Sequence, residues 1–291
     1  MVPTLQEMEG LCQKPQWREV GSWLARRIAR PLALYLTWLI VHWPVSAHSV
    51  TAMALVVAGI GSVLLGIGNS HCFVVGCIML ELWYVLDHVD GQVARFRRRV
   101  SVTGIYLDYM MHHAVHVGLA FALGFGLARH SGELLWAVSG ASLSLGTMLL
   151  AISNDCRYKA FHTAMTMMAG APSKCVREPT ISVSESASSS SVPATIPEET
   201  SGERVDRPRR MRNMLLAVHR GLLKICEIPS VLIALAGLAT TMVVREDLGW
   251  LATHAYVATL AVTAPTLALA RLAKQVWAEI PDKEFQEVAR L

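Results

Sequence analysis

Long apolar segments separated by polar loops are the feature that most limits what this chain can fold into. Of its 291 residues, 53% are hydrophobic and 16% are charged, whereas soluble domains carry about 25% charged residues. A helix needs about 20 mainly apolar residues to cross a bilayer. Hydropathy predicts six such spans, at residues 50–68, 72–94, 103–128, 133–153, 228–244 and 248–273. We therefore predict an all-α integral membrane protein with six transmembrane helices.

The segment before these spans has a different pattern. Residues 1–15 are polar, and we interpret them as an N-terminal tail. Over residues 16–30, apolar and basic side chains alternate at helical spacing, which is typical of a helix on an anionic membrane surface. The apolar stretch 31–43 is too short to cross a bilayer. Residues 16–43 are thus expected to form an amphipathic interfacial helix.

The rest of the chain divides by composition. Residues 44–171 contain the first four spans and form the main membrane domain. The centre of residues 172–210 is rich in Ser, Pro, Ala and Glu and has few large apolar side chains, so it cannot offset the entropy of ordering. We predict a disordered cytoplasmic linker there. Residues 211–273 then form a surface helix and the last two spans, and residues 274–291 form a C-terminal tail.

Basic residues predict the orientation of the chain. The densest basic run is Arg95, Arg97, Arg98 and Arg99. With six spans, the basic residues at 157–159 and 207–212 fall on the same side. Loops rich in Lys and Arg stay in the cytoplasm. We expect both termini and the site mouth in the cytoplasm, in a bacterial inner membrane. The net charge of +4 is small, which gives no support for nucleic-acid binding.

Ionisable side chains within the predicted spans indicate a functional site, because they are costly at membrane depth. Asp87 and Asp90 are three residues apart, so they share one face of the second span. Asp108 and His112 are four apart and share a face of the third. Carboxylates that lie close together repel one another unless they share protons or cations. Because an oxygen-rich ligand set favours Mg²⁺, Mn²⁺ or Ca²⁺ over zinc, the spacing predicts a site for divalent cations.

Residues beside these acids indicate a phosphate-containing ligand. Gly91 and Ala94 remove side-chain bulk next to the carboxylates, which lets a ligand approach the backbone. Arg95 offers planar donors that match phosphate oxygens. A cation site, an arginine and an uncrowded surface together favour a diphosphate.

The order of these residues resembles the signature of a known family. The run reads Asp87-x-x-Asp90-Gly91-x-x-Ala94-Arg95, then eight residues, Gly104, three residues and Asp108. It is similar to the signature of the CDP-alcohol phosphotransferases, integral membrane enzymes of phospholipid synthesis. The family signature continues to a fourth aspartate, where this chain has His112. Upstream, the family has Pro-Asn before a threonine, and this chain has Ala47-His48 before Thr51.

The resemblance implies a reaction and the residues that bind its substrates. In the family, two divalent cations, Mg²⁺ or Mn²⁺, clamp the diphosphate of a CDP-linked donor while an alcohol displaces CMP. The implied metal ligands here are Asp87, Asp90, Asp108 and His112. The implied CDP-binding residues are Thr51, Gly91, Ala94, Arg95 and Gly104. The resemblance further implies that one substrate is a lipid, for which we expect CDP-diacylglycerol, and that the protein can form a homodimer in the membrane.

The position of His112 leaves more than one interpretation open. A neutral imidazole accepts protons at cytoplasmic pH, so His112 can serve as the catalytic base that the family's last aspartate provides. As a ligand it would shift the preference of one ion toward Mn²⁺. The missing aspartate and the missing Pro-Asn instead favour an altered or inactive relative that binds nucleotide or cation without turnover. A third alternative is an Asp-rich prenyl diphosphate transferase. The Gly-x-x-Ala-Arg run that follows the acids argues against it, because that run belongs to the signature of the CDP-alcohol phosphotransferases.

Overall fold

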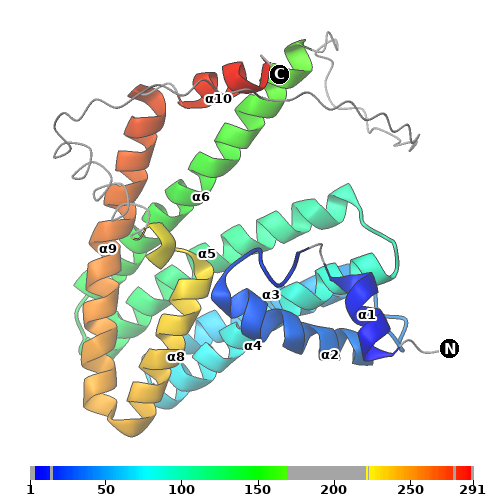
Figure 1. Ribbon diagram of the computed structural model, residues 1–291. Helices are drawn as coiled ribbons and strands as arrows, with labels where there is room; N and C mark the ends of the chain where they lie inside the picture. The colour runs from blue at the N-terminus through cyan, green and yellow to red at the C-terminus, as the bar shows by residue number, and fades with distance from the viewer. Residues whose placement is uncertain (1–3, 14–15, 169–220, 222, 278–279, 290–291) are drawn as a thin grey trace, which may run out of the picture.

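The computed structural model describes residues 4–13, 16–168, 221, 223–277 and 280–289, and these form helices connected by short loops (Figure 1). The helices are α1 (Leu5–Cys12), a π-helical turn η1 (Ala25–Ala29), α2 (Arg30–Ile40), α3 (Ala47–Gly66), α4 (Ser70–Phe96), α5 (Val102–Ser131), α6 (Leu135–Met168), α8 (Ile228–Val244), α9 (Glu246–Trp277) and α10 (Ile280–Ala289). No strand occurs in this part of the chain, which confirms the all-α fold class there.

Five of the described helices are long and apolar enough to cross a membrane, namely α3, α4, α5, α6 and α9. They coincide with the first four predicted spans and with the last, and they indicate an integral membrane protein. The remaining predicted span coincides with α8, which has 17 residues and so falls short of the usual length of about 20. The sixth crossing therefore stays a prediction.

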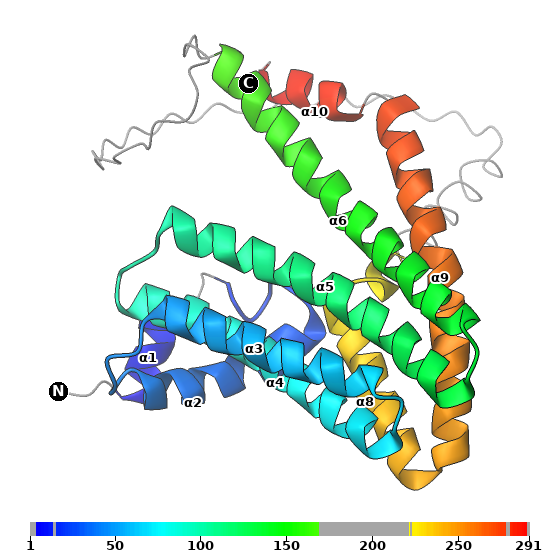
Figure 2. The same ribbon diagram turned by 180° about the vertical axis from the view of Figure 1, so that it is seen from behind.

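The helices form a packed group with two members that diverge from it. In both views α3, α4 and α5 lie side by side, while α6 leaves this group at an angle and packs against α9, from which it diverges toward its C-terminal end (Figures 1 and 2). Glycines allow close approach where helices cross. A Cβ on Gly76 of α4 would lie 2.9 Å from the carbonyl oxygen of Gly61 on α3, and one on Gly124 of α5 would lie 2.4 Å from the Cα of Gly140 on α6.

The N-terminal segment differs from the expected tail and interfacial helix in two respects. Part of the predicted tail folds into α1, which begins with a capping box between Thr4 and Glu7. The next helical stretch begins at Trp23 instead of residue 16. The physical reason is Arg30, whose guanidinium donates hydrogen bonds to backbone carbonyls of the preceding turn and holds it out of the helix. Whether this helix lies on a membrane surface stays a prediction.

A buried amide fixes α2 to α4. The Gln92 side chain is 1% exposed. Its Nε2 donates to the Arg30 carbonyl at 3.3 Å, and its Oε1 accepts from the Thr37 hydroxyl at 3.0 Å. Because a buried amide left without partners costs about 1–3 kcal/mol, these contacts hold α2 in one position beside the acid-bearing turn of α4. The predicted linker, residues 172–210, and most of the predicted surface helix lie outside the described residues.

Candidate metal and nucleotide site

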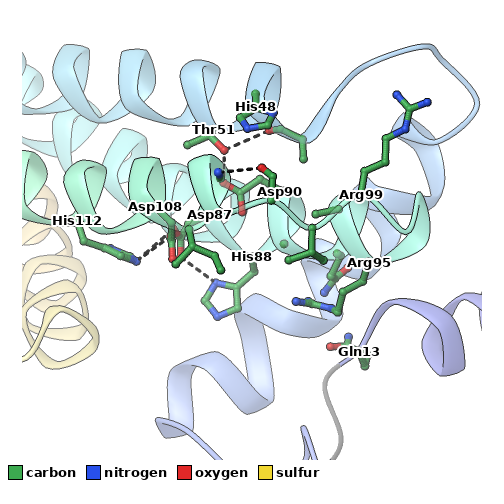
Figure 3. Close-up of a pocket in the computed structure, with 18 of the residues that line it drawn as sticks. Gln13, His48, Thr51, Asp87, His88, Asp90, Arg95, Arg99, Asp108 and His112 are labelled. Carbon is green, nitrogen blue, oxygen red and sulfur yellow. Dashed lines mark hydrogen bonds and ion pairs between the residues drawn. The ribbon is translucent and has the colours of Figure 1, made fainter. Parts of the chain in front are cut away.

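A cavity of about 400 Å³ lies where α3, α4 and α5 meet the N-terminal segment (Figure 3). We call it the site cavity. All nine residues that the sequence singles out line it, namely Thr51, Asp87, Asp90, Gly91, Ala94, Arg95, Gly104, Asp108 and His112. Most of the residues that line the cavity are polar or charged, and the residues that the sequence singles out converge on one place in the fold.

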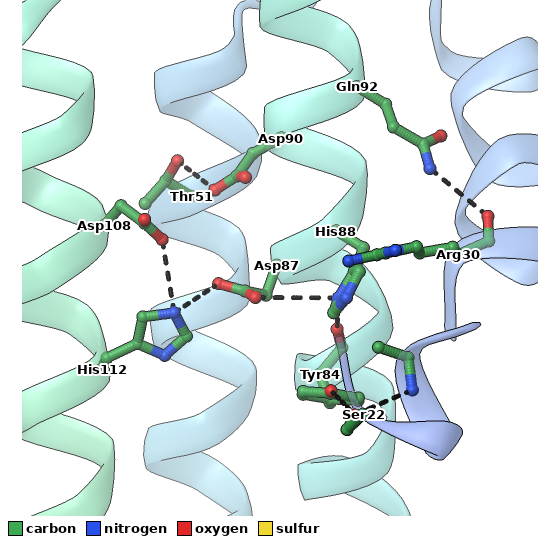
Figure 4. Close-up of polar contacts among 11 residues, drawn as sticks. Ser22, Arg30, Thr51, Tyr84, Asp87, His88, Asp90, Gln92, Asp108 and His112 are labelled. Carbon is green, nitrogen blue, oxygen red and sulfur yellow. Dashed lines mark hydrogen bonds and ion pairs between the residues drawn. The ribbon is translucent and has the colours of Figure 1, made fainter. Parts of the chain in front are cut away.

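Three of these side chains form a cluster that we call the acid cluster. The Nε2 of His112 lies 3.4 Å from Oδ1 of Asp87 and 3.5 Å from Oδ1 of Asp108 (Figure 4). One ligand atom from each residue lies within 4.8 Å of the others. Asp87 comes from α4, whereas the other two come from consecutive turns of α5. Two neighbouring helices therefore bring their carboxylates together.

The geometry of the acid cluster fits a shared cation. Both carboxylate oxygens lie slightly beyond the usual hydrogen-bond length from Nε2 of His112. The three potential ligand atoms therefore surround a common position and do not form a close hydrogen-bonded pair. Two carboxylates and one imidazole suit Mg²⁺ or Mn²⁺, with the nitrogen favouring the latter. The other ring nitrogen of His112, Nδ1, is buried and has no hydrogen-bond partner among the described residues. His112 thus presents Nε2 to the cavity.

Asp90 lies in the same cavity with a different partner. Its side chain is buried, at 7% exposure, and its Oδ2 accepts a hydrogen bond from the Thr51 hydroxyl at 2.6 Å. The structure therefore connects Asp90 with α3 through a hydrogen bond, and Asp90 is not among the three residues that form the acid cluster. The predicted role of Asp90 as a metal ligand stays a prediction, and Thr51 acquires a definite contact in the site.

Thr51→Val should lower kcat/KM for CMP release about 10- to 100-fold. The substitution keeps the size of the side chain but removes a hydrogen bond to a carboxylate, and such bonds contribute about 1.5–3 kcal/mol. Initial rates measured at several donor concentrations would show the effect. Thr51→Ser is the matched control, because it retains the hydroxyl. An unchanged rate in the Val variant would show that this contact does not orient Asp90.

Arg95 stands at the opposite end of the site cavity from His112 (Figure 3). Its Nε donates to the carbonyl of Cys12, at the end of α1. A Cβ on Gly91 would lie 3.3 Å from Nη1 of Arg95, so the glycine leaves room for the guanidinium. Gly104 lies in the first turn of α5, where its N–H donates to Ser101 Oγ at 3.0 Å.

The cavity includes residues that the sequence reasoning missed. Gln13 and Arg30 line it from the N-terminal segment, and Arg99 lines it from the loop between α4 and α5. Arg30 and Arg99, together with Arg95, place positive charge in a cavity that also holds the acid cluster. Basic and amide residues of this kind are common in polar segments, so no local signal distinguishes Gln13 or Arg30. Only the packing of the N-terminal segment against α4 brings them to the cavity.

Two further histidines near the cluster have partners of their own. His113, one residue after His112, points to α6, where its Nε2 lies 2.8 Å from Oδ2 of Asp155. His88 has its Nδ1 2.9 Å from the carbonyl oxygen of Tyr84 and 3.7 Å from Oδ2 of Asp87. The His113 contact links α5 to α6, whereas both of these His88 contacts lie within α4.

Comparison with known proteins identifies the family of the central domain. Residues 45–172 match the family model described as CDP-alcohol phosphatidyltransferase. The matched region contains α3, α4, α5 and α6, and with them the whole acid cluster. A comparison with curated proteins found no match.

Proposed function

We propose a reaction from one premise, that residues 45–172 form a CDP-alcohol phosphatidyltransferase domain. Members of this family transfer a phosphate-linked group from a CDP-alcohol to an alcohol acceptor. We propose that this protein uses CDP-diacylglycerol as donor, transfers its phosphatidyl group to a polar alcohol, and releases CMP. The observation that carries the proposal is the convergence of Asp87, Asp108 and His112 in a cavity that also holds Arg95.

Each side chain has a distinct part in this reaction. Asp87 and Asp108 would hold a divalent cation, Mg²⁺ or Mn²⁺, with Asp90 a proposed ligand of a second one. When bound, such a cation neutralises the charge of the diphosphate. The terminal nitrogens of Arg95 bind phosphate oxygens and orient the donor.

His112 acts on the acceptor. Its Nε2 takes the proton of the incoming hydroxyl. The hydroxyl oxygen then forms a bond to the outer phosphorus of the donor. The bridging P–O bond breaks, and CMP leaves with the electron pair. Because Nε2 has one lone pair facing the cavity, it accepts a proton or binds a cation, and we propose the first role.

A lipid donor and a polar acceptor agree with the surroundings of the cavity. Most of the residues that line the cavity are polar or charged, which suits the diphosphate and a polar alcohol. The helices that carry it expose large apolar side chains, including Val63 of α3 and Ile78 of α4, against which acyl chains can lie. We further propose that the cavity opens to the cytoplasm, because Arg97, Arg98 and Arg99 follow α4 at its mouth.

The test is to supply purified protein with CDP-diacylglycerol, Mg²⁺ or Mn²⁺, and pooled polar alcohols. Release of CMP together with a new phospholipid, identified by mass spectrometry, would support the proposal. Protein that binds CDP but releases no CMP with any pool would instead support a relative that binds without turnover. Displacement of labelled CDP by prenyl diphosphates, but not by CDP-diacylglycerol, would favour the prenyl transferase alternative.

A further inference from the structure

The α1 helix is docked beside the site cavity although it precedes the family match. Met8 and Cys12 are fully buried and pack with Leu34 of α2. Partly buried apolar side chains, among them Phe96 at the end of α4, complete this contact. Because its apolar face is covered in this way, α1 has one defined position relative to α2 and α4.

The C-terminal end of α1 meets Arg95. The last carbonyls of a helix have no partners within it, and they carry partial negative charge that favours a cation nearby. Arg95 supplies that cation, since its Nε donates to the Cys12 carbonyl. Burial raises the pKa of the Cys12 thiol to about 11, so that side chain stays neutral and the contact belongs to the backbone. The position of α1 thus sets the direction of the Arg95 guanidinium.

The next residue along the chain, Gln13, lines the cavity itself (Figure 3). Its Nε2 lies 3.5 Å from the carbonyl oxygen of Arg30, which also accepts from Gln92. A carbonyl oxygen has two lone pairs, so it can accept from both amides. Gln13 therefore stands at a junction of α1, α2 and α4, on the Arg95 side of the cavity and away from His112.

We propose that α1 is part of the donor-binding site, with two separate contributions. The Cys12 carbonyl is a positioning contact that aims Arg95 into the cavity. Gln13 forms the wall for the nucleoside end of the donor, because the diphosphate would extend between the acid cluster and Arg95, and Gln13 lies beyond the acid cluster on the Arg95 side. The Gln13 side-chain amide has both a hydrogen-bond donor and a hydrogen-bond acceptor. These match the edge of cytosine that carries a hydrogen-bond donor beside an acceptor. This inference rests on the proposed function.

The Gln13 contribution is tested by nucleotide binding. Gln13→Ala should weaken CDP binding about three- to tenfold, the usual range for one hydrogen bond, and should reduce the preference for CDP over UDP. Competition by inorganic pyrophosphate should not change, because it reports the diphosphate end alone. Gln6→Ala, on the exposed face of α1, is the matched control. Equal CDP affinity in the Gln13 variant and the parent would overturn this role.

The positioning contact is tested by a double-mutant cycle. Met8→Asp places a charge in the buried contact and should displace α1, which should weaken CDP binding about as much as Arg95→Ala does. Measured in a Gln13→Ala background, which removes the separate contribution of Gln13, the variant with both substitutions should bind no more weakly than the variant with Arg95→Ala, because both substitutions remove the same contact. Met8→Ala should also weaken CDP binding, but by less. It can replace Met8→Asp in the cycle if the Asp variant does not fold. Additive losses would mean that α1 contributes stability alone and would overturn the proposal.

CDP binding by the parent protein distinguishes a failure of the proposed function from a failure of the proposed role of α1. A parent protein that binds no CDP at all would overturn the proposed function and, with it, the role of α1. A parent that binds CDP while the Gln13, Met8 and control variants bind it equally well would overturn only the role of α1.

Discussion

Replacing Asp87 with asparagine is expected to reduce CMP release by about 10³-fold or more. Asp87 is the only residue of the acid cluster that α4 contributes, so the substitution removes the charge with which α4 would bind the proposed cation. A catalytic cation supplies several kcal/mol of charge stabilisation, and each 1.4 kcal/mol corresponds to a factor of ten in rate. Initial rates of CMP release under saturating donor and cation would measure the loss.

A second measurement separates lost catalysis from lost folding. Mn²⁺ should raise the melting temperature of the parent in detergent, because a ligand that binds the folded state stabilises it. The Asp87→Asn variant should still fold, because asparagine has nearly the same shape as aspartate and its neutral side chain relieves the repulsion with Asp108. Its melting temperature should not rise with Mn²⁺, because a ligand carboxylate is missing. Asp247→Asn, at the exposed start of α9, is the matched control and should keep both activity and the shift. An Asp87→Asn variant whose melting temperature still rises with Mn²⁺ would contradict the assignment of Asp87 as a ligand.

His112→Ala should lower turnover about 10²- to 10⁴-fold, the range usual for the loss of a general base. CDP binding should stay close to that of the parent, because the donor is held by Arg95 and the carboxylates. The Mn²⁺ concentration needed for half-maximal activity should also stay within about twofold if Nε2 serves as the base. Rates measured over a series of Mn²⁺ concentrations would test both statements.

His130→Ala is the control for this variant, because His130 lies at the other end of α5, where its ring stacks on Trp250 at 3.8 Å. It should leave turnover unchanged. Equal turnover in the His112 variant and the parent would remove His112 from the mechanism. A large increase in the Mn²⁺ requirement would instead assign Nε2 as a metal ligand.

The sequence determined which residues share a helical face. Spacings of three and four residues placed Asp87 with Asp90 and Asp108 with His112, and long apolar runs predicted the helices that carry them. Periodicity supports such inferences because it depends on local geometry that every α-helix shares. The family match over residues 45–172 confirms the resemblance that those residues suggested.

Tertiary structure alone decided how these faces are turned toward one another. Periodicity does not set the rotation of a helix against its neighbours, so the sequence could not show that Asp90 bonds to Thr51 while Asp87 joins the acid cluster. Nor could it bring Cys12 to Arg95, 83 residues away. Both contacts depend on side-chain packing between segments far apart in the chain, and no local pattern records that packing.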